Sequence, residues 1–327
     1  MSKQPCFIGV DTSNYTTSVA ACTLDGEVIG NFRRLLPVKE GECGLRQSDA
    51  VFAHVKQLPM LLDELDALLD GVYEPIGVGV STRPRRVEGS YMPCFLAGVS
   101  ASHALTAGRG IPLYEFSNQE GHVMAAAYSS GCMHVLFQTP FLAFHVSGGT
   151  TEALLVKPLQ DGFDISLAGG TADLNAGQAI DRVGVHLGLP FPCGVAMEQL
   201  ASGYQGRLEK KPVCVRDGFC HLSGLENMAK ELYAKTQDKQ ATSAFVFDFI
   251  CRSLLELRRQ IFDRHGTYPV LYAGGVMSNR LMRGALGKGA CAYFAEAGFS
   301  SDNAAGIALL ARRRYLGDMQ KKEQGSE

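Results

Sequence analysis

Hydrophobic and polar positions follow the same order in two separate stretches of the chain. An apolar strand at 6–10 precedes a turn of small and hydroxyl residues at 11–17, a second apolar strand, and the pair Asp25-Gly26 before a third strand. Asp-Gly between apolar runs is a strong hairpin signal. Residues 141–167 repeat this order around the turn SGGTT, with their own Asp-Gly pair. A repeated supersecondary unit predicts two pseudo-equivalent lobes.

Apolar residues at helical spacing predict helices between and after these two units. The predicted helices are 49–71, 91–110, 241–266 and 301–317. Pro59 is the expected site of a kink in the first of them. Residues 268–286 are typical of a strand, a Gly-Gly turn and a helix, and the chain ends in a polar tail.

Composition supports a globular protein with two lobes. The chain has 327 residues, of which 46% are hydrophobic and 20% charged, with a net charge of -2. This length exceeds what one small core organises. A near-neutral charge argues against a protein that grips nucleic acid alone through a large basic surface, so a nucleic-acid partner would be shared with other subunits.

The ten cysteines are dispersed among apolar neighbours and form no C-x-x-C pair. This usage is typical of reduced thiols in a cytosolic protein. The N-terminal segment lacks an apolar stretch long enough for a signal peptide, and no run approaches the length of a membrane span. These patterns predict a cytoplasmic location and no membrane partner.

Two kinds of turn carry candidate chemistry. A tight turn such as the one at 147–151 leaves backbone N–H groups that can cradle phosphate oxygens, although most such turns are plain hairpins. Gly274 and Gly275 follow a buried strand and let a flat ring approach the backbone, and Asn279 can hydrogen-bond a base or ribose. The alternative is a strand-to-helix turn whose glycines serve packing.

Several segments, in order along nearly the whole chain, resemble the Kae/TsaD family of the actin-like ATPase superfamily. This family comprises the threonylcarbamoyl transferases of tRNA modification. The matching segments are GVDTSNYTTSVA, HVSGGTTEALLV, GGTADLNAGQAIDRVGVHLGLPFPCG, HLSGLENMAKEL, AGGVMSNRLMR and SSDNAAGIALLA. The third of these, at 169–194, has the most specific run of spacings.

The resemblance implies an α/β, two-lobed actin-like ATPase fold, related to ribonuclease H, with duplicated mixed sheets flanked by helices. The implied lobes are 1–115 and 116–302, with a helix at 303–319 packing back on the first lobe and a flexible tail at 320–327. The implied activity transfers the threonylcarbamoyl group from threonylcarbamoyl-AMP to N6 of adenosine 37 of tRNA. The implied partners are tRNA, a nucleotide (ATP or the acyl-adenylate) and the protein subunits of the threonylcarbamoylation complex.

The resemblance also assigns candidate site residues. Asp181 and Glu198 fall where acids bind the ribose hydroxyls, and both are otherwise interpreted as solvated helix acids. Asp11 and Ser147 are the catalytic candidates, acting by positioning and polarising rather than as nucleophiles. The nucleotide-binding candidates are Ser13, Ser147, Gly148, Gly149, Thr150, Asp181, Gly194, Glu198, Gly274, Gly275 and Asn279.

This sequence departs from the family at the reaction side. The family's metal motif is His-x-x-x-His, and its first position here is Asn118. The histidine that usually follows Ser-Gly-Gly is Thr150, and an adjacent Asp-Glu pair in the first hairpin is Tyr15 and Thr16. The opening acid of that hairpin is kept as Asp11.

The family implies one divalent metal, iron or zinc, and three interpretations of this site stay open. A metal binds through His122 and Asp302, with Asn118 as a weak ligand, and oxygen ligands then favour magnesium or manganese. Alternatively no metal binds and His122 and Asn118 hydrogen-bond phosphate or each other, or both are structural. Asp302 also suits a helix N-cap. His145 is a further candidate donor or a core histidine.

Two rival functions follow from these departures. One is a catalytically altered paralogue that binds a nucleotide as a regulatory or scaffold subunit. The other is a small-molecule kinase of the same superfamily, for which Asp11 is the obvious catalytic carboxylate. A protease is disfavoured because the chain has no His-Glu-x-x-His helix.

Overall fold

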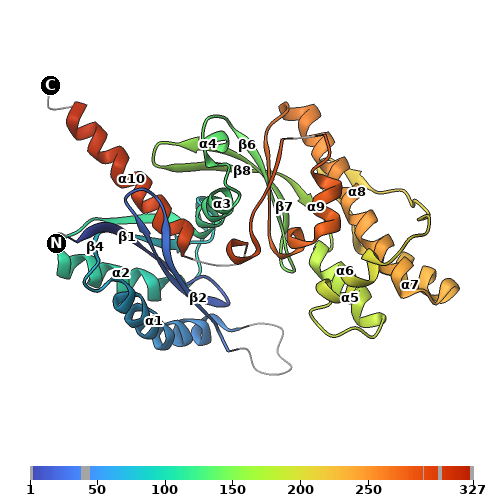
Figure 1. Ribbon diagram of the computed structural model, residues 1–327, viewed down its shortest axis with the longest axis horizontal. Coiled ribbons are helices and arrows are strands. Elements are labelled where there is room, and N and C mark those ends of the chain that lie inside the picture. The colour runs from blue at the N-terminus through green and yellow to red at the C-terminus, as the bar shows by residue number, and fades with distance from the viewer. Residues whose placement is uncertain (1–2, 38–44, 290, 301–303, 325–327) are drawn as a thin grey trace. The chain divides into compact units, whose positions relative to one another are not determined.

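The computed structural model describes residues 3–37, 45–289, 291–300 and 304–324. The Cα positions divide the chain into two compact units, each with its own sheet and helices (Figure 1). The first unit comprises Met1–Tyr128, Pro158–Asp164 and Ser301–Glu327, and the second comprises Ser129–Lys157 and Ile165–Ser300. The predicted lobe boundaries at 115/116 and 302/303 stay a prediction, and these units place the 116–128 segment with the first sheet.

A five-stranded mixed sheet organises the first unit, in the order β3-β2-β1-β4-β5. Its strands are β1 Gln4–Asp11, β2 Thr16–Thr23, β3 Val28–Leu35, β4 Tyr73–Arg83 and β5 Leu113–Ser117. β1, β2 and β3 pair antiparallel, whereas β4 runs parallel to β1 and β5 parallel to β4. The Asp-Gly hairpin predicted at Asp25-Gly26 joins β2 to β3.

Helices cover this sheet on both faces because its strands bury side chains on both sides. The helices of this unit are α1 Gln47–Leu69, α2 Phe95–Arg109, α3 Asn118–Ser129 and α10 Ala305–Gln324. Leu61 and Leu65 of α1 join one core with Ile8 and Val10 of β1. On α10, Tyr315 meets Phe7 of β1 edge to face, with ring centroids 5.2 Å apart.

The second unit contains a seven-stranded sheet in the order β12-β11-β6-β7-β8-β10-β9. Its strands are β6 Phe141–Val146, β7 Thr151–Leu159, β8 Gly162–Thr171, β9 Val215–Arg216, β10 Phe219–Cys220, β11 Val270–Ala273 and β12 Ala292–Phe294. The run β8-β7-β6-β11-β12 repeats the order β3-β2-β1-β4-β5 of the first sheet. The predicted duplication is therefore confirmed, and β10 and β9 extend the second copy at one edge.

Four helices of the second unit pack against α8 Lys239–His265, which is buried along much of its length: α5 Ala176–His186, α6 Gly194–Ser202, α7 Ser223–Thr236 and α9 Arg280–Leu286. The unit also contains α4 Met133–Leu136 and the 3-10 turns η1 Gly275–Ser278 and η2 Ala297–Phe299. The Asp238 carboxylate caps α8 by accepting from the Gln240 and Ala241 amides at 2.8 and 3.0 Å. The helix ends at Gly266, as expected from the sequence.

The bounds of some helices differ from the predicted ones, most clearly at the start of α2 and at the end of α10. Pro59 lies within α1, where the expected kink stays a prediction, and α2 begins at Phe95, four residues after the predicted start at 91. α10 extends to Gln324, so the part of the predicted tail at 320–324 is helical, and 325–327 lie outside the described residues. Across the described helices, none is long and apolar enough to cross a membrane.

Candidate nucleotide-binding site

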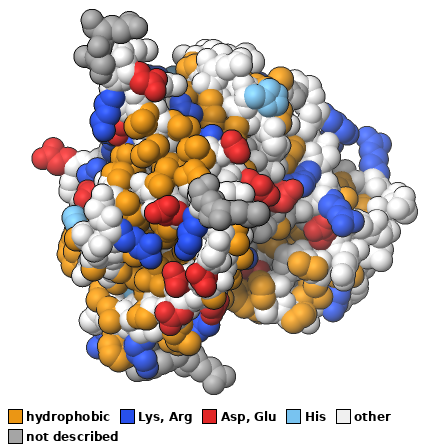
Figure 2. Space-filling view, turned by 60° about the vertical axis from the view of Figure 1, so that its left-hand side comes forward, with side chains coloured by type: hydrophobic (Ala, Val, Ile, Leu, Met, Phe, Trp, Pro, Cys, Tyr) orange, Lys and Arg blue, Asp and Glu red, His pale blue; other side chains and the backbone are white. Residues whose placement is uncertain are grey.

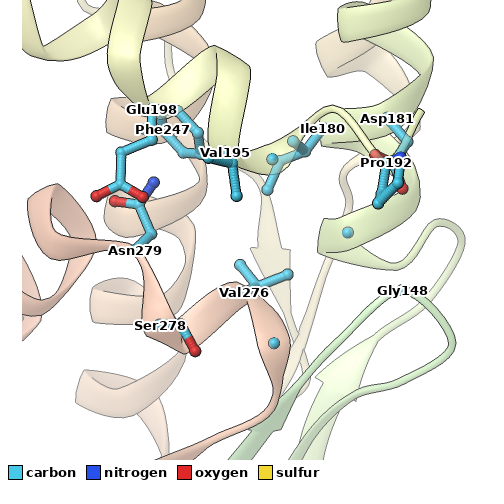
Figure 3. Close-up of a pocket in the computed structure, with 13 residues that line it drawn as sticks. Gly148, Ile180, Asp181, Pro192, Val195, Glu198, Phe247, Val276, Ser278 and Asn279 are labelled. Atoms are coloured by element: carbon cyan, nitrogen blue, oxygen red, sulfur yellow. The ribbon is translucent and has the colours of Figure 1, made fainter. Parts of the chain in front are cut away.

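One pocket of about 320 Å³ in the second unit gathers residues from five segments (Figure 3). They come from the turn after β6, from α5, from α6 and the residues before it, from α8 and from the turn after β11. The lining residues are Gly148, Gly177, Ile180, Asp181, Pro192, Gly194, Val195, Glu198, Phe247, Gly275, Val276, Ser278 and Asn279. Of the predicted nucleotide-binding residues, the pocket thus brings together Gly148, Asp181, Gly194, Glu198, Gly275 and Asn279.

The turn between β6 and β7 is held against the first turn of α5. Gly177 makes this approach possible, because a Cβ there would lie 2.7 Å from the backbone of Gly148. The Gly177 amide donates to the Ser147 carbonyl at 3.1 Å, and the Ala176 amide donates to the Thr151 hydroxyl at 2.9 Å. The helix N-terminus therefore fixes the turn from behind, and Gly148 and Gly149 are left exposed.

The Ser147 hydroxyl organises this turn from within. It accepts from the amides of Gly149 and Thr150 at 3.3 and 3.1 Å. Two of the N–H groups predicted to face a phosphate thus point to Ser147 Oγ. Ser147, Gly149 and Thr150 shape the turn, and among its residues Gly148 is the one that lines the pocket.

The two predicted ribose-binding acids line the pocket from different helices. Asp181 accepts from the Cys193 amide at 2.8 Å, and Glu198 accepts from the Arg280 amide at 2.8 Å, in each case through one carboxylate oxygen. In Figure 3, Asp181 lies beside Pro192 on one side of the pocket and Glu198 lies beside Asn279 on the other. Each acid is therefore a positioned pocket residue with a second oxygen available to a ligand hydroxyl, rather than a freely solvated helix acid.

Asn279 has a structural role as well as a place in the pocket. Its side-chain oxygen caps α9 by accepting from the Met282 amide at 2.9 Å, and the residue is buried. The side-chain amide nitrogen is the group left to donate to a ligand. Gly274 lies behind the pocket: its φ of 98° and the approach of the Val146 carbonyl, 2.2 Å from where a Cβ would be, exclude a side chain.

The apolar wall of the pocket went unpredicted. Ile180, Val195 and Val276 project between the two polar sides in Figure 3. Val195 is 70% exposed, so a ligand in the pocket can cover its side chain. The residues that sequence reasoning missed are Gly177, Ile180, Pro192, Val195, Phe247, Val276 and Ser278. Most fall within the quoted family segments, whereas Phe247 lies in a plain amphipathic helix and gives no sequence signal.

Asp173 joins two of the family segments outside the pocket. Its carboxylate accepts from the Ser223 hydroxyl at 2.6 Å and from the Leu222 and Leu174 amides at 2.8 and 2.7 Å. Burial alone would raise the pKa of this carboxyl, but these hydrogen bonds hold it below its usual value. The loop before α5 is thereby tied to the start of α7.

The first unit holds a second polar cluster, around Asp11 at the end of β1. Asp11 is fully buried, and its carboxylate accepts from the Ser13 hydroxyl at 2.6 Å, from the Ser81 hydroxyl, and from the Asn118 side-chain amide at 3.2 Å. Thr12 ties the same turn to α2 by accepting from the Gly98 amide at 3.1 Å. Ser13 and Asp11 therefore bind each other within this buried polar network.

The first residues of α3 add one donor to the Asp11 network and hold the start of the helix in place. Asn118, in the family's first metal position, directs its amide nitrogen to Asp11. Glu120 is buried and accepts from the Ser117 amide and hydroxyl at 2.9 and 2.8 Å. His122 lies half-buried one turn further along α3, and His145 lies half-buried in β6 of the other unit.

The duplicated sheets with helices on both faces define the class of this protein, the actin-like ATPase fold. A ROK family glucokinase from Streptomyces griseus superposes with a TM-score of 0.53 at 12% identity, covering 94% of this chain and 99% of that one. Full-length HypF gives a TM-score of 0.58 at 12% identity, over 96% of this chain and 56% of that one. At this identity the likeness shows the fold alone.

Sequence comparison then places the chain within one family. The family described as tRNA N6-adenosine threonylcarbamoyltransferase matches residues 53–309. A protein of that name from Thermus thermophilus is 31% identical over 314 residues, covering 94% of this chain and 92% of that one. The Bacillus licheniformis protein of the same name is 28% identical over 290 residues, 86% and 82% of the two chains. The chain belongs to the tRNA N6-adenosine threonylcarbamoyltransferase family, as its sequence motifs predicted.

Membership in this family implies in general a metal ion and an ATP-related ligand. The pocket suits the ATP-related ligand. Within the described ranges, no group of three or more His, Cys, Asp and Glu residues lies close enough to hold a metal ion. Asn118 donates to Asp11, His122 lies half-buried on α3, and Asp302 lies outside the described residues.

Proposed function

We propose that this protein transfers the threonylcarbamoyl group from threonylcarbamoyl-AMP to N6 of adenosine 37 of tRNA. One observation carries the proposal: six residues predicted from the family to bind a nucleotide, and scattered between 148 and 279, line a single pocket. Apolar side chains flank its middle, acids stand on two sides, and a glycine turn borders it. This is the arrangement that a base, a ribose and a phosphate require of a protein.

The residues take complementary parts in holding the adenylate. The carboxylates of Asp181 and Glu198 accept from hydroxyls of the ligand, and charge-assisted hydrogen bonds of this kind are about twice as strong as neutral ones. Ile180, Val195 and Val276 cover apolar ligand surface. The phosphate lies at the Ser147–Thr150 turn, where it competes with Ser147 Oγ for the amides of Gly149 and Thr150.

The reaction needs positioning more than a protein nucleophile. The lone pair of N6 attacks the carbonyl carbon of the mixed anhydride, and the bond from that carbon to the phosphate oxygen breaks. AMP leaves with the electron pair, and the N6 proton passes to a phosphate oxygen or to water. The turn amides and the α5 N-terminus stabilise the charge that grows on the leaving phosphate. We assign no step to a metal.

The Asp11 cluster supports a positioning role better than a kinase role. A catalytic base must present an oxygen to its substrate, but the Asp11 carboxylate is fully buried and already accepts from Ser13, Ser81 and Asn118. We infer that Asp11 orders the turn at 11–17, and that this order serves substrate binding.

We further infer that tRNA reaches this protein with the help of other subunits, and in the cytoplasm, where tRNA is modified. The face of the molecule in Figure 2 carries basic and acidic side chains interspersed with apolar ones. This distribution agrees with the net charge of -2 and offers no continuous basic surface on that face. Partner subunits would supply the remaining contacts to the RNA backbone.

The test supplies the purified chain with threonylcarbamoyl-AMP, unmodified tRNA and the partner subunits of its own cell. We expect modified adenosine, measured by mass spectrometry of nucleosides.

Asp181→Asn and Glu198→Gln keep the hydrogen bonds to the Cys193 and Arg280 amides but lose the charge. Each variant is expected to weaken AMP binding about 10-fold, because a charge-assisted hydrogen bond contributes about 1.5–3 kcal/mol. Asp263→Asn, on the exposed side of α8, is the matched control and should bind AMP as the wild type does.

The rival functions predict different outcomes of the same assay. Intact AMP binding without modified adenosine would favour the scaffold paralogue. Phosphate transfer from ATP to a small acceptor would favour the kinase. AMP binding that is unchanged in both pocket variants would show that the nucleotide lies elsewhere and would remove the basis of the proposal.

A further inference from the structure

An aromatic ring stands exposed beside the pocket without a partner among the described residues. Phe191 is 76% exposed, one of the largest exposures of any apolar side chain in the described chain. Prolines at 190 and 192 flank it and restrict the backbone on both sides. A solvent-facing phenylalanine with its backbone restricted on both sides offers a ring that an aromatic or apolar partner can cover.

The chain around Phe191 places this ring at the rim of the pocket. Pro192 and Gly194 line the pocket, but Phe191 does not. Asp181 anchors the segment through the Cys193 amide, and Gly177, one helical turn earlier on α5, contacts the Gly148 backbone. The phenyl ring therefore belongs to the side of the pocket that carries the phosphate turn.

We propose that Phe191 is a stacking platform for a base of the tRNA substrate. This inference rests on the proposed function, since the acyl group to be transferred is attached to the phosphate of the adenylate. The accepting adenine must approach that phosphate from outside the pocket, past the rim. RNA loops are recognised by bases that leave their stack and lie on aromatic side chains, whatever their sequence.

The positions of neighbouring residues favour an RNA base over the adenylate. The adenylate has its own apolar wall in Ile180, Val195 and Val276, inside the pocket. Phe191 lies outside the lining set, on the rim that the second substrate must pass. Arg182, the neighbour of Asp181 on α5, is also exposed and can contact an RNA phosphate. Its guanidinium also forms an ion pair with Glu226, with 3.4 Å between Nη1 and Oε2.

The absence of tryptophan from the whole sequence makes a direct test possible. In Phe191→Trp, the single indole reports the environment of this position. The variant is mixed with unmodified tRNA and the partner subunits, and the signal of an identical mixture containing wild-type chain is subtracted. We expect tRNA to quench the indole fluorescence through base stacking, with the same concentration dependence as tRNA binding. Because no turnover is needed, this outcome is independent of whether modified adenosine forms.

Three other results of the fluorescence experiment would contradict stacking on a tRNA base. Quenching by AMP alone would place the ring over the adenylate. A spectral shift caused by a partner subunit without tRNA would make Phe191 part of a protein interface. No response to any addition would show that the ring contacts none of them. Each of these three results overturns the proposal.

Binding measurements provide the second readout. Phe191→Ala is expected to raise the Kd and the KM for tRNA about 10-fold, with the Kd for AMP unchanged, since stacking one base contributes about that factor. Phe191→Tyr should retain tRNA binding because it keeps the ring. Leu167→Ala removes an apolar side chain of 51% exposure on β8 and serves as the control. Equal tRNA affinities of Phe191→Ala and Leu167→Ala would contradict a stacking role.

Discussion

At the residue scale, the buried carboxylate of Asp11 shows how one substitution changes the chemistry of a site. The family pattern has a histidine at position 118, and the asparagine in this chain donates a neutral hydrogen bond to Asp11 at 3.2 Å. A buried carboxylate is costly unless donors surround it, and here two hydroxyls and an amide do so. Asn118 therefore has a physical role of its own, as a donor that keeps Asp11 satisfied.

Substitutions at 118 test this role. Asn118→Ala is expected to lower the free energy of unfolding by about 1–2 kcal/mol, because a charged acceptor loses one donor. Asn118→Asp should lower it further, because a second carboxylate then faces Asp11. Urea unfolding followed by circular dichroism gives both values, and Gln119→Ala is the neighbouring control. Equal stabilities of wild type and Asn118→Asp would show that the side chain does not face Asp11.

His54 of α1 should make the first unit sensitive to acid. It is fully buried, and because the Thr17 hydroxyl donates to Gln57 at 2.7 Å, we assign the proton on His54 Nδ1 to the bond with Thr17 at 2.8 Å. Burial lowers the pKa of His54 to about 4, against a weaker opposing effect of the Ser13 backbone. The unfolded chain, with a histidine pKa near 6.5, then binds a proton that the folded protein rejects, so stability falls as the pH drops from about 6.5 towards 4.

This linkage predicts a loss of about 2 kcal/mol of unfolding free energy between pH 7 and pH 5 that depends on His54. Urea unfolding at the two pH values measures it. His54→Gln should show a smaller drop between them, whereas His134→Gln, a histidine outside the core, should behave as the wild type does. An identical pH dependence in His54→Gln and wild type would refute the assignment.

At the element scale, small residues decide how closely α10 approaches its neighbours. A Cβ at Gly306 would lie 1.9 Å from the Gly121 carbonyl of α3, which is far inside van der Waals contact. This crossing fixes α3, and with it Asn118, against α10 and the sheet. Sequence periodicity identified α10 as a helix but gave no sign that one of its glycines is a contact surface.

A pair of glycine substitutions separates packing from helix propensity. Gly306→Ala is expected to cost at least about 3 kcal/mol, because backbone atoms must move to admit the methyl group. Gly284→Ala, on α9 with no atom near the added Cβ, should stabilise the protein by about 0.5–1 kcal/mol. Thermal unfolding reports both changes. A harmless Gly306→Ala would show that α3 and α10 do not cross this closely.

At the scale of the whole molecule, two copies of one sheet topology carry different polar groups. After β1 of the first copy the turn carries Asp11 and Ser13, which bind each other, and after β6 of the second it carries Ser147 and two exposed glycines. Between β8 and β11 the second copy has the helices α5, α6, α7 and α8, where the described part of the first copy has α1 between β3 and β4, and α5, α6 and α8 provide most of the pocket lining. The duplication explains the fold, and these helices explain where the site lies.

The sequence by itself determined the duplicated strand order, the principal helices, the family and six of the pocket residues. It could do so because hydrophobic periodicity and turn chemistry are local, and because the family segments carry fixed spacings. Only the tertiary structure decided what each polar group faces. It showed that Asn118 donates to Asp11 and that Phe247 lines the pocket. Those facts depend on contacts between residues that are mostly tens to hundreds of positions apart, which no local pattern encodes.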